Sequence, residues 1–122
     1  MTVLEAIRQA DLHLPNGFSV QEKLRWLSRL DGLIFREIHS LYEGCGEEFV
    51  GYEGETALHA ELLAAEPYGE ELYLRYLERC MDDANGDTDR LINSQRQFRA
   101  AYETYARHYN RSHRIQARAR RK

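Results

Sequence analysis

The acidic segment at residues 82–89 comes closer than any other part of the chain to the composition of a metal site. It reads Asp-Asp-Ala-Asn-Gly-Asp-Thr-Asp, and calcium loops also combine acidic residues with a glycine at the turn. When Gly86 is aligned with that turn glycine, Met81 and Ile92 fall at the first and twelfth ligand positions, where calcium loops carry carboxylates. The pattern therefore favours a solvated turn between two helices, with one carboxylate as a helix N-cap.

The histidines and cysteines do not suggest a metal or nucleophilic centre. None of the five histidines lies three or four residues from another, whereas a metal site needs ligands that converge. Cys45 and Cys80 have no base beside them in the sequence, and Cys80 falls on the packing face of a predicted helix. The sequence also lacks a glycine-rich phosphate loop and a nucleophile elbow. We therefore predict no catalytic residues, no metal and no cofactor, and we do not expect an enzyme.

The C-terminal end is the most strongly charged segment. It carries six positive charges and no acid, from Arg111, Arg114, Arg118, Arg120, Arg121 and Lys122. With those six removed from the 17 Lys and Arg, 11 remain against 20 Asp and Glu, which is a net charge of −9. Such an end can neutralise phosphates, dock on an acidic protein surface or only solubilise the chain. We favour protein docking, because the acidic body repels a duplex lying along it.

Residues 43–71 form the acidic counterpart, with nine Glu and no Lys or Arg. Residues 43–66 also contain four glycines and two isolated aromatic residues, Phe49 and Tyr52. Long irregular connections inside a domain are usually functional or disordered. We predict an irregular acidic loop or arm, and the two aromatic residues favour an arm that docks on another surface. Within it, residues 57–65 could form a short helical turn. Opposite charges at two places in one small chain favour a partner, which is a second copy, another protein or a polyanion.

Length and composition predict one domain. The chain has 122 residues, and we expect a single helical domain at residues 1–110 and a basic tail at residues 111–122. The first residues lack the apolar core of a signal peptide, and no run approaches the roughly 20 apolar residues of a membrane span. The sequence therefore predicts a protein that is made in a cytoplasm and has no membrane contact.

Hydrophobic periodicity predicts an all-α chain of about four helices. The first helix is expected at about residues 3–13, where Thr2 and Glu5 form a capping-box pattern. The second is expected at about residues 20–42, directly after the same pattern at Ser19 and Glu22. The spacing of the two capping residues predicts where each helix starts.

The second predicted helix is apolar around more than half its circumference. One of its stripes contains Leu24, Leu27, Asp31, Ile34, Ile38 and Leu41. So wide an apolar surface indicates a helix surrounded by other elements. Gly32 within it costs about 1 kcal/mol relative to alanine, which indicates either a close neighbour or a tolerated kink.

The second half of the chain predicts an antiparallel helical hairpin. Pro67 opens one helix, and the pair Asn85-Gly86 ends it. The next helix begins at Asp87 or Thr88 and runs to the basic tail. Because the turn is so short, the two helices must pack side by side in opposite directions.

Six aromatic residues are candidates for a subunit interface, because aromatic residues are enriched where proteins meet. They are Trp26, Phe49, Tyr52, Tyr102, Tyr105 and Tyr109. The last three form one stripe on the final helix, and simple core packing is the more common reason for such a stripe.

Several stretches of the chain form a recognisable series over about residues 2–111. They are residues 25–38 (RWLSRLDGLIFREI), 49–52 (FVGY), 62–68 (LLAAEPY), 72–73, 76–77, 84–86 (ANG), 93–94, Phe98, 101–102, 105–106 and 109–111. In this order and spacing, the sequence resembles the head–tail connector, or adaptor, family of long-tailed phages and prophages.

The resemblance implies a structural virion protein. About twelve copies would form a ring beneath the portal, extend the DNA channel and hold the next neck protein. DNA would pass through the ring without specific binding, and the protein would reside in the virion neck after assembly in the host cytoplasm. The C-terminal segment, which is longer and more basic than the family pattern, is similar to a portal-docking peptide. The residues leave open a small nucleic-acid-binding packaging or regulatory protein of a phage.

Overall fold

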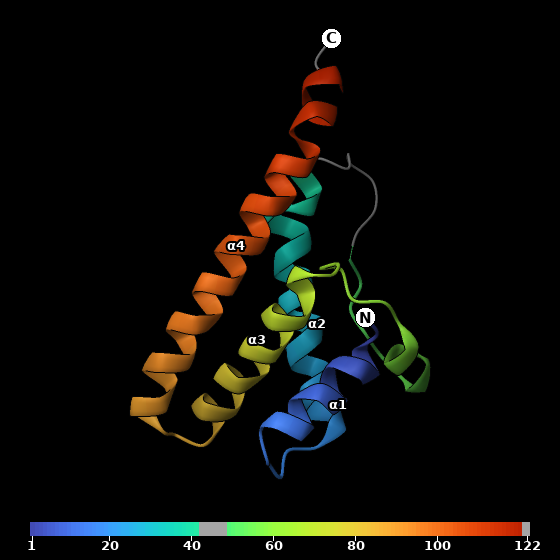
Figure 1. Ribbon diagram of the computed structural model, residues 1–122. Helices are drawn as coiled ribbons and strands as arrows, with labels where there is room; N and C mark the ends of the chain where they lie inside the picture. The colour runs from blue at the N-terminus through green and yellow to red at the C-terminus, as the bar shows by residue number, and fades with distance from the viewer. Residues whose placement is uncertain (42–48, 121–122) are drawn as a thin grey trace.

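The computed structural model describes the backbone of residues 1–41 and 49–120 and the side chains of residues 1–41, 49–54 and 56–113. Its elements are α1 (Val3–His13), α2 (Val20–Glu37), η1 (His39–Leu41), η2 (Glu55–His59), α3 (Tyr68–Ala84) and α4 (Thr88–Arg120), where η marks a short 3-10 helix. The prediction of an all-α fold with four main helices is confirmed for this part of the chain (Figure 1).

The predicted C-terminal hairpin is confirmed. In Figure 1, α3 and α4 lie side by side, and α4 continues beyond the other helices toward the C-terminus. Gly86 has a φ of +70° in the turn, a conformation that glycine adopts without strain. The Asp87 carboxylate accepts the backbone N–H of Arg90 at 3.1 Å and so caps α4. The acidic segment is thus a capped turn, and the described residues contain no cluster that could hold a metal ion.

Side-chain caps define the starts of α1 and α2. Thr2 accepts the N–H of Glu5 at 3.2 Å, and the Glu5 carboxylate accepts the N–H of Thr2 at 3.1 Å, which completes the predicted capping box. At α2, the Ser19 hydroxyl accepts the N–H of Glu22 at 3.1 Å. These contacts place both starts where the sequence predicts them.

The predicted end of the second helix, at residue 42, is wrong. The α-helix ends at Glu37, and η1 follows it. The Ser40 hydroxyl donates to the carbonyl of Arg36 at 2.8 Å and so satisfies one of the acceptors that a helix leaves free at its C-terminus. Residue 42 itself lies outside the described residues.

An ion pair holds the turn between α1 and α2. Lys23 is only 3% exposed, and its Nζ lies 2.7 Å from the carboxylate of Asp11. The same carboxylate accepts the side-chain amide of Asn16 at 3.0 Å. Because a buried ammonium needs a partner, this contact fixes how the two helices meet.

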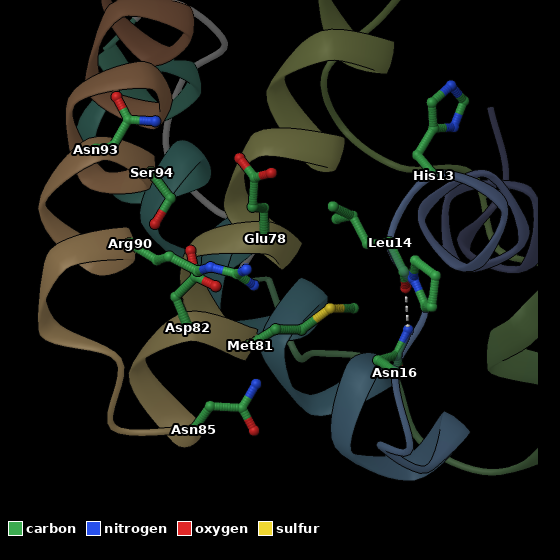
Figure 2. A pocket seen from close by; sticks show the side chains of 11 residues that line it. His13, Leu14, Asn16, Glu78, Met81, Asp82, Asn85, Arg90, Asn93 and Ser94 are labelled. Atoms are coloured by element: carbon green, nitrogen blue, oxygen red, sulfur yellow. Dashed lines mark hydrogen bonds between the residues drawn. The ribbon is translucent and has the colours of Figure 1, made fainter.

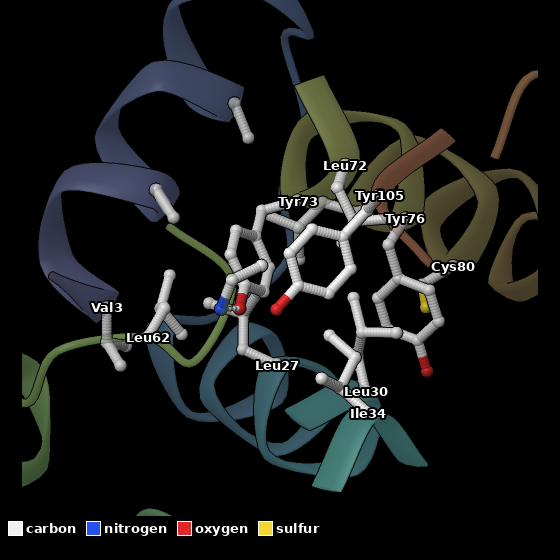
Figure 3. Packing of buried hydrophobic residues seen from close by; sticks show 14 of the residues in the cluster. Val3, Leu27, Leu30, Ile34, Leu62, Leu72, Tyr73, Tyr76, Cys80 and Tyr105 are labelled. Atoms are coloured by element: carbon white, nitrogen blue, oxygen red, sulfur yellow. Dashed lines mark hydrogen bonds between the residues drawn. The ribbon is translucent and has the colours of Figure 1, made fainter. Parts of the chain in front are cut away.

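The core lies where the four helices and the end of the arm meet (Figure 3). Its fully buried members include Val3, Ile7, Leu27, Leu30, Ile34, Leu72, Tyr73 and Leu77. Burying one such side chain stabilises the fold by about 1.5–3 kcal/mol. Leu27, Leu30 and Ile34 are at most 1% exposed, so the chain itself covers the central apolar stripe of α2. That stripe therefore gives no independent reason for a partner.

Residues 49–67 form an arm that returns along the start of the chain. Thr2 and Glu61 form an antiparallel bridge, and the N–H of Val3 donates to the carbonyl of Ala60 at 3.0 Å. The helical turn predicted for residues 57–65 is wrong in its bounds, because the 3-10 helix η2 spans Glu55–His59. The rest of the arm is irregular, as predicted.

Replacement of Gly32 by alanine is expected to stabilise the protein by up to about 1 kcal/mol, because alanine favours the helix interior. A Cβ here would lie 3.4 Å from the guanidinium of Arg36 and 3.6 Å from the ring of Phe49, which are ordinary contacts. Urea unfolding followed by circular dichroism measures the change. A loss of stability would mean that the Phe49 ring needs the space.

Candidate functional site

Asp31 is the centre of a buried polar network that fastens the arm to the helices. Its side chain is fully buried in the middle of α2. The carboxylate accepts the Tyr73 hydroxyl of α3 at 2.6 Å, the backbone N–H of Leu63 at 2.9 Å and the hydroxyl of Tyr52. The Tyr73 hydroxyl in turn accepts the N–H of Ala64 at 2.8 Å. One carboxylate thus joins α2, α3 and both ends of the arm.

Burial sets the protonation chemistry of this network. Loss of hydration raises the pKa of Asp31, although the hydrogen bonds from Tyr52, Tyr73 and Leu63 favour its charged form. Burial and the charge of Asp31 both raise the pKa of the two phenols, so they remain protonated donors. Asp31 has no exposed surface, and each of its hydrogen bonds joins parts of the chain's own fold.

The stability of the wild type relative to Asp31→Asn is expected to fall as the pH rises. The folded protein holds the Asp31 proton more tightly than the unfolded chain does, because the folded pKa lies above its ordinary value of 3.8. This contribution is complete below that value and is lost as the pH rises through the folded pKa. Urea unfolding of both proteins across the acidic range tests it. A difference that is constant or grows with pH would contradict the raised pKa.

The arm presents its tip, which we define as residues 49–54, on the outside of α2. The N–H of Tyr52 donates to the Ser28 hydroxyl at 3.1 Å, and the rings of Phe49 and Tyr52 meet edge to face at 5.2 Å. A Cβ on Gly51 would lie 2.8 Å from the Ser28 hydroxyl, so only glycine fits. Val50 lies in this tip with 87% of its surface exposed.

The six predicted interface aromatics divide into two groups. Tyr105 and Tyr109 are 3% and 7% exposed, so this chain covers their rings and their burial argues against an interface role. The other four, Trp26, Phe49, Tyr52 and Tyr102, are half-buried and keep some accessible surface. Their role at an interface stays a prediction.

Tyr105 and Tyr109 instead join α4 to η1. The Tyr105 hydroxyl and the Nε2 of His39 share a hydrogen bond of 2.6 Å. The ring of Tyr109 stacks between His39 at 4.3 Å and His113 at 3.8 Å, measured between ring centroids. The stripe that the sequence left open between core and interface is thus core at these two positions.

The predicted docking residues lie on the projecting end of α4. Arg111 is exposed, and the helix continues without a break to Arg120, so the predicted domain boundary falls within a helix. The backbone places Arg114 and Arg118 along the same extension, whereas residues 121 and 122 lie outside the described residues. In Figure 1 this end of α4 projects beyond the other helices.

Figure 2 shows a cavity of about 340 Å³ between the end of α1 and the base of the hairpin. Glu78 and Asp82 of α3 line it together with Arg90, Asn93 and Ser94 of α4. The Ser94 hydroxyl donates to the carbonyl of Leu91 at 3.2 Å and is not paired with a base. His13 also lines the cavity, and its Nδ1 contacts the carbonyl of Gln9 at 2.9 Å rather than the Ser94 hydroxyl, so these two side chains do not form a nucleophile–base pair.

A second depression contains four arginines and was not predicted from the sequence. We call it the Arg groove, a cavity of about 570 Å³ whose arginines come from α2 (Arg29, Arg36), α3 (Arg79) and α4 (Arg99). The four residues are far apart in the sequence, so no charge run marks them. The one available signal was the spacing of Arg29 and Arg36, which places them on one side of α2.

The predicted inert character of Cys80 agrees with its position. The side chain is 6% exposed, and burial raises the pKa of its thiol to about 11. The thiolate is therefore scarce at neutral pH, and Cys80 is a core residue. Cys45 lies outside the described residues.

No helix in the described part of the chain is both long enough and apolar enough to cross a membrane. Searches of protein-family models, curated proteins and solved structures give no significant match to this chain.

Proposed function

We propose that this chain is a structural virion protein of the head–tail connector type. The proposal is carried by the positions, in the folded chain, of residues that contribute to the family resemblance. Asp31, Tyr52 and Tyr73 come from three separate matched stretches of the sequence and meet in one buried network. These matched residues are far apart in the sequence but meet at the arm in the folded chain. Their convergence supports a resemblance that reflects a shared fold.

In the proposed assembly, about twelve copies form a closed ring beneath the portal. A cyclic ring joins one face of each subunit to a different face of the next, so each copy needs two unlike surfaces. The chain offers an acidic arm with an exposed apolar tip, the Arg groove and a basic helical extension. The partners are further copies, the portal protein and the next neck protein, and DNA passes through the channel without specific binding.

The basic end of α4 is the proposed portal-docking element. Arg111 is exposed, and the backbone of the helix leads away from the body toward the C-terminus. Long-range attraction between opposite charges increases the rate of such an encounter and weakens as salt is added.

Deletion of residues 112–122 tests the proposal. Pull-down on the purified portal protein of the same phage is expected to retain the full chain and to lose the truncated chain. Circular dichroism should show that both remain helical. Arg96→Glu/Arg107→Glu is the matched control, because both residues are exposed on the body of α4. The proposal is contradicted if the truncated chain binds the portal as well as the full chain does.

A second candidate is a small nucleic-acid-binding protein, which the Arg groove and the basic helix end favour. In that case the same deletion abolishes retention on DNA rather than on the portal. A gel shift that persists at moderate salt would support this candidate, since the affinity of phosphate contacts falls steeply with salt.

A further inference from the structure

The Arg groove is lined by four arginines from three helices. Within the described part of the chain, Arg75 and Arg90 form ion pairs with nearby carboxylates, whereas none of the groove arginines lies within 4 Å of one. Three of the four side chains are exposed, and Arg79 is half-buried. Four guanidinium groups around one depression favour a ligand that brings carboxylates or phosphates.

The floor of the groove is apolar and aromatic. It consists of Leu30, Leu33, Tyr76, Phe98 and Tyr102. The ring of Phe98 contacts that of Tyr76 at 5.1 Å and that of Tyr102 at 5.8 Å, measured between centroids. A floor of this kind surrounded by arginines fits a segment that combines an apolar side chain with acidic neighbours.

The tip of the arm has that composition. Val50 is 87% exposed, Glu53 is exposed three residues later, and the surrounding residues 43–71 contain nine Glu and no Lys or Arg. Within residues 49–54, the arm does not line the groove of its own chain. Tyr52 is bonded to Ser28 and Asp31, and the tip lines a neighbouring depression that shares only Arg29 with the groove.

We propose that the Arg groove of one copy binds the arm tip of a second copy. Val50 packs on the aromatic floor, and Glu53 pairs with the arginines of the groove. Because tip and groove are different surfaces of one chain, the contact repeats head to tail and can close a ring. The inference rests on the proposed function only for the biological role of that ring. The contact itself can be tested without the portal protein.

Charge reversal on either side is expected to break the contact. Arg79→Glu/Arg99→Glu reverses the groove at two residues that do not line the chain's own arm, and Val50→Lys/Glu53→Lys reverses the tip. Sedimentation velocity of the full chains should show self-association weakened by about tenfold or more for each variant, as for the loss of close charge pairs. Arg96→Glu/Arg107→Glu, with the same change in charge outside the groove, should associate like the wild type.

Mixing the two variants distinguishes contacts between chains from contacts within a chain. In an equimolar mixture, each unaltered tip meets an unaltered groove, and each basic tip meets an acidic groove. Association is therefore expected to return. If only a single chain carrying all four substitutions recovers, the tip belongs in the groove of its own chain and the inference is wrong.

A labelled peptide of residues 47–56 provides a second measurement by fluorescence anisotropy. We expect it to bind the full chain and to lose affinity by about tenfold or more for the groove variant. The inference is overturned if the peptide does not bind the wild type. It is also overturned if a single-stranded oligonucleotide binds the groove instead, with arm substitutions having no effect.

The outcome is separable from that of the proposed function. If retention on the portal depends on residues 112–122 but self-association is unaffected by charge reversal in the groove, the connector proposal stands and this inference is wrong. Self-association that depends on tip and groove without portal binding would do the opposite.

Discussion

Replacement of Asp31 by alanine is expected to lower the free energy of unfolding by about 3–5 kcal/mol. The substitution removes the acceptor for the hydroxyls of Tyr52 and Tyr73 and for the backbone N–H of Leu63. These donors would remain in a site where the Asp31 side chain is fully buried, and a buried donor without a partner is costly. Urea unfolding at neutral pH, followed by circular dichroism, measures the loss.

Asp31→Asn is the matched comparison, because its amide has nearly the same shape and keeps one oxygen acceptor. Its cost is expected to be smaller, at about 1–2 kcal/mol. Asp89→Ala, at an exposed site in the first turn of α4, controls for the loss of one carboxylate. If Asp31→Ala is no more destabilising than Asp89→Ala, the network does not hold the arm.

Replacement of Gly69 by alanine is expected to cost about 2–4 kcal/mol, because a Cβ cannot be accommodated without a backbone shift. The added carbon would lie 2.3 Å from the carbonyl oxygen of Ala64, and that atom belongs to the backbone of the arm. The N–H of Ala64 is also engaged, because it donates to the Tyr73 hydroxyl at 2.8 Å. Relief of the clash must therefore disturb the Asp31 network.

Gly17→Ala is the control for this prediction. A Cβ at Gly17 would meet no atom within 4 Å, so the substitution should be neutral or slightly stabilising. Thermal unfolding of both variants gives the comparison. Equal melting temperatures would show that the end of the arm is free to move away from α3.

The helices were predictable because their signals are local. The Thr2 and Glu5 capping box and the Asn85-Gly86 turn act within a few residues, and each produced the predicted boundary. The end of α2 was not predictable in this way. The 3-10 helix η1 that follows it contacts α4 through His39 and Tyr105, which is 66 residues away, and no local pattern encodes that contact.

The docking of the arm left one signal in the sequence that was not used. Asp31 interrupts an otherwise apolar stripe, and a charged residue at such a position must find hydrogen-bond partners when it is buried. The identity of those partners could not be predicted. Tyr52 and Tyr73 lie 21 and 42 residues away, and only the packing of the arm and α3 on α2 brings them to the same carboxylate.

The Arg groove was beyond prediction for a related reason. Its positive charge comes from three helices, and each contributes one or two arginines among nearby acids. The basic end of the chain is visible in the sequence as a cluster of arginines, whereas a basic patch that is assembled by folding is not. The candidate interface residues Tyr105 and Tyr109 show the converse, because their spacing could not tell a covered face from an open one.

The convergence of the arm on a single carboxylate has a consequence for its motion. Tyr52 lies near one end of the arm and Leu63 near the other, and both depend on Asp31. Release of that side chain frees both ends together, so the arm should open as one cooperative unit rather than fray. In native-state hydrogen exchange, the amides of Tyr52, Leu63 and Ala64 should then share one opening free energy, below that of the α3–α4 hairpin.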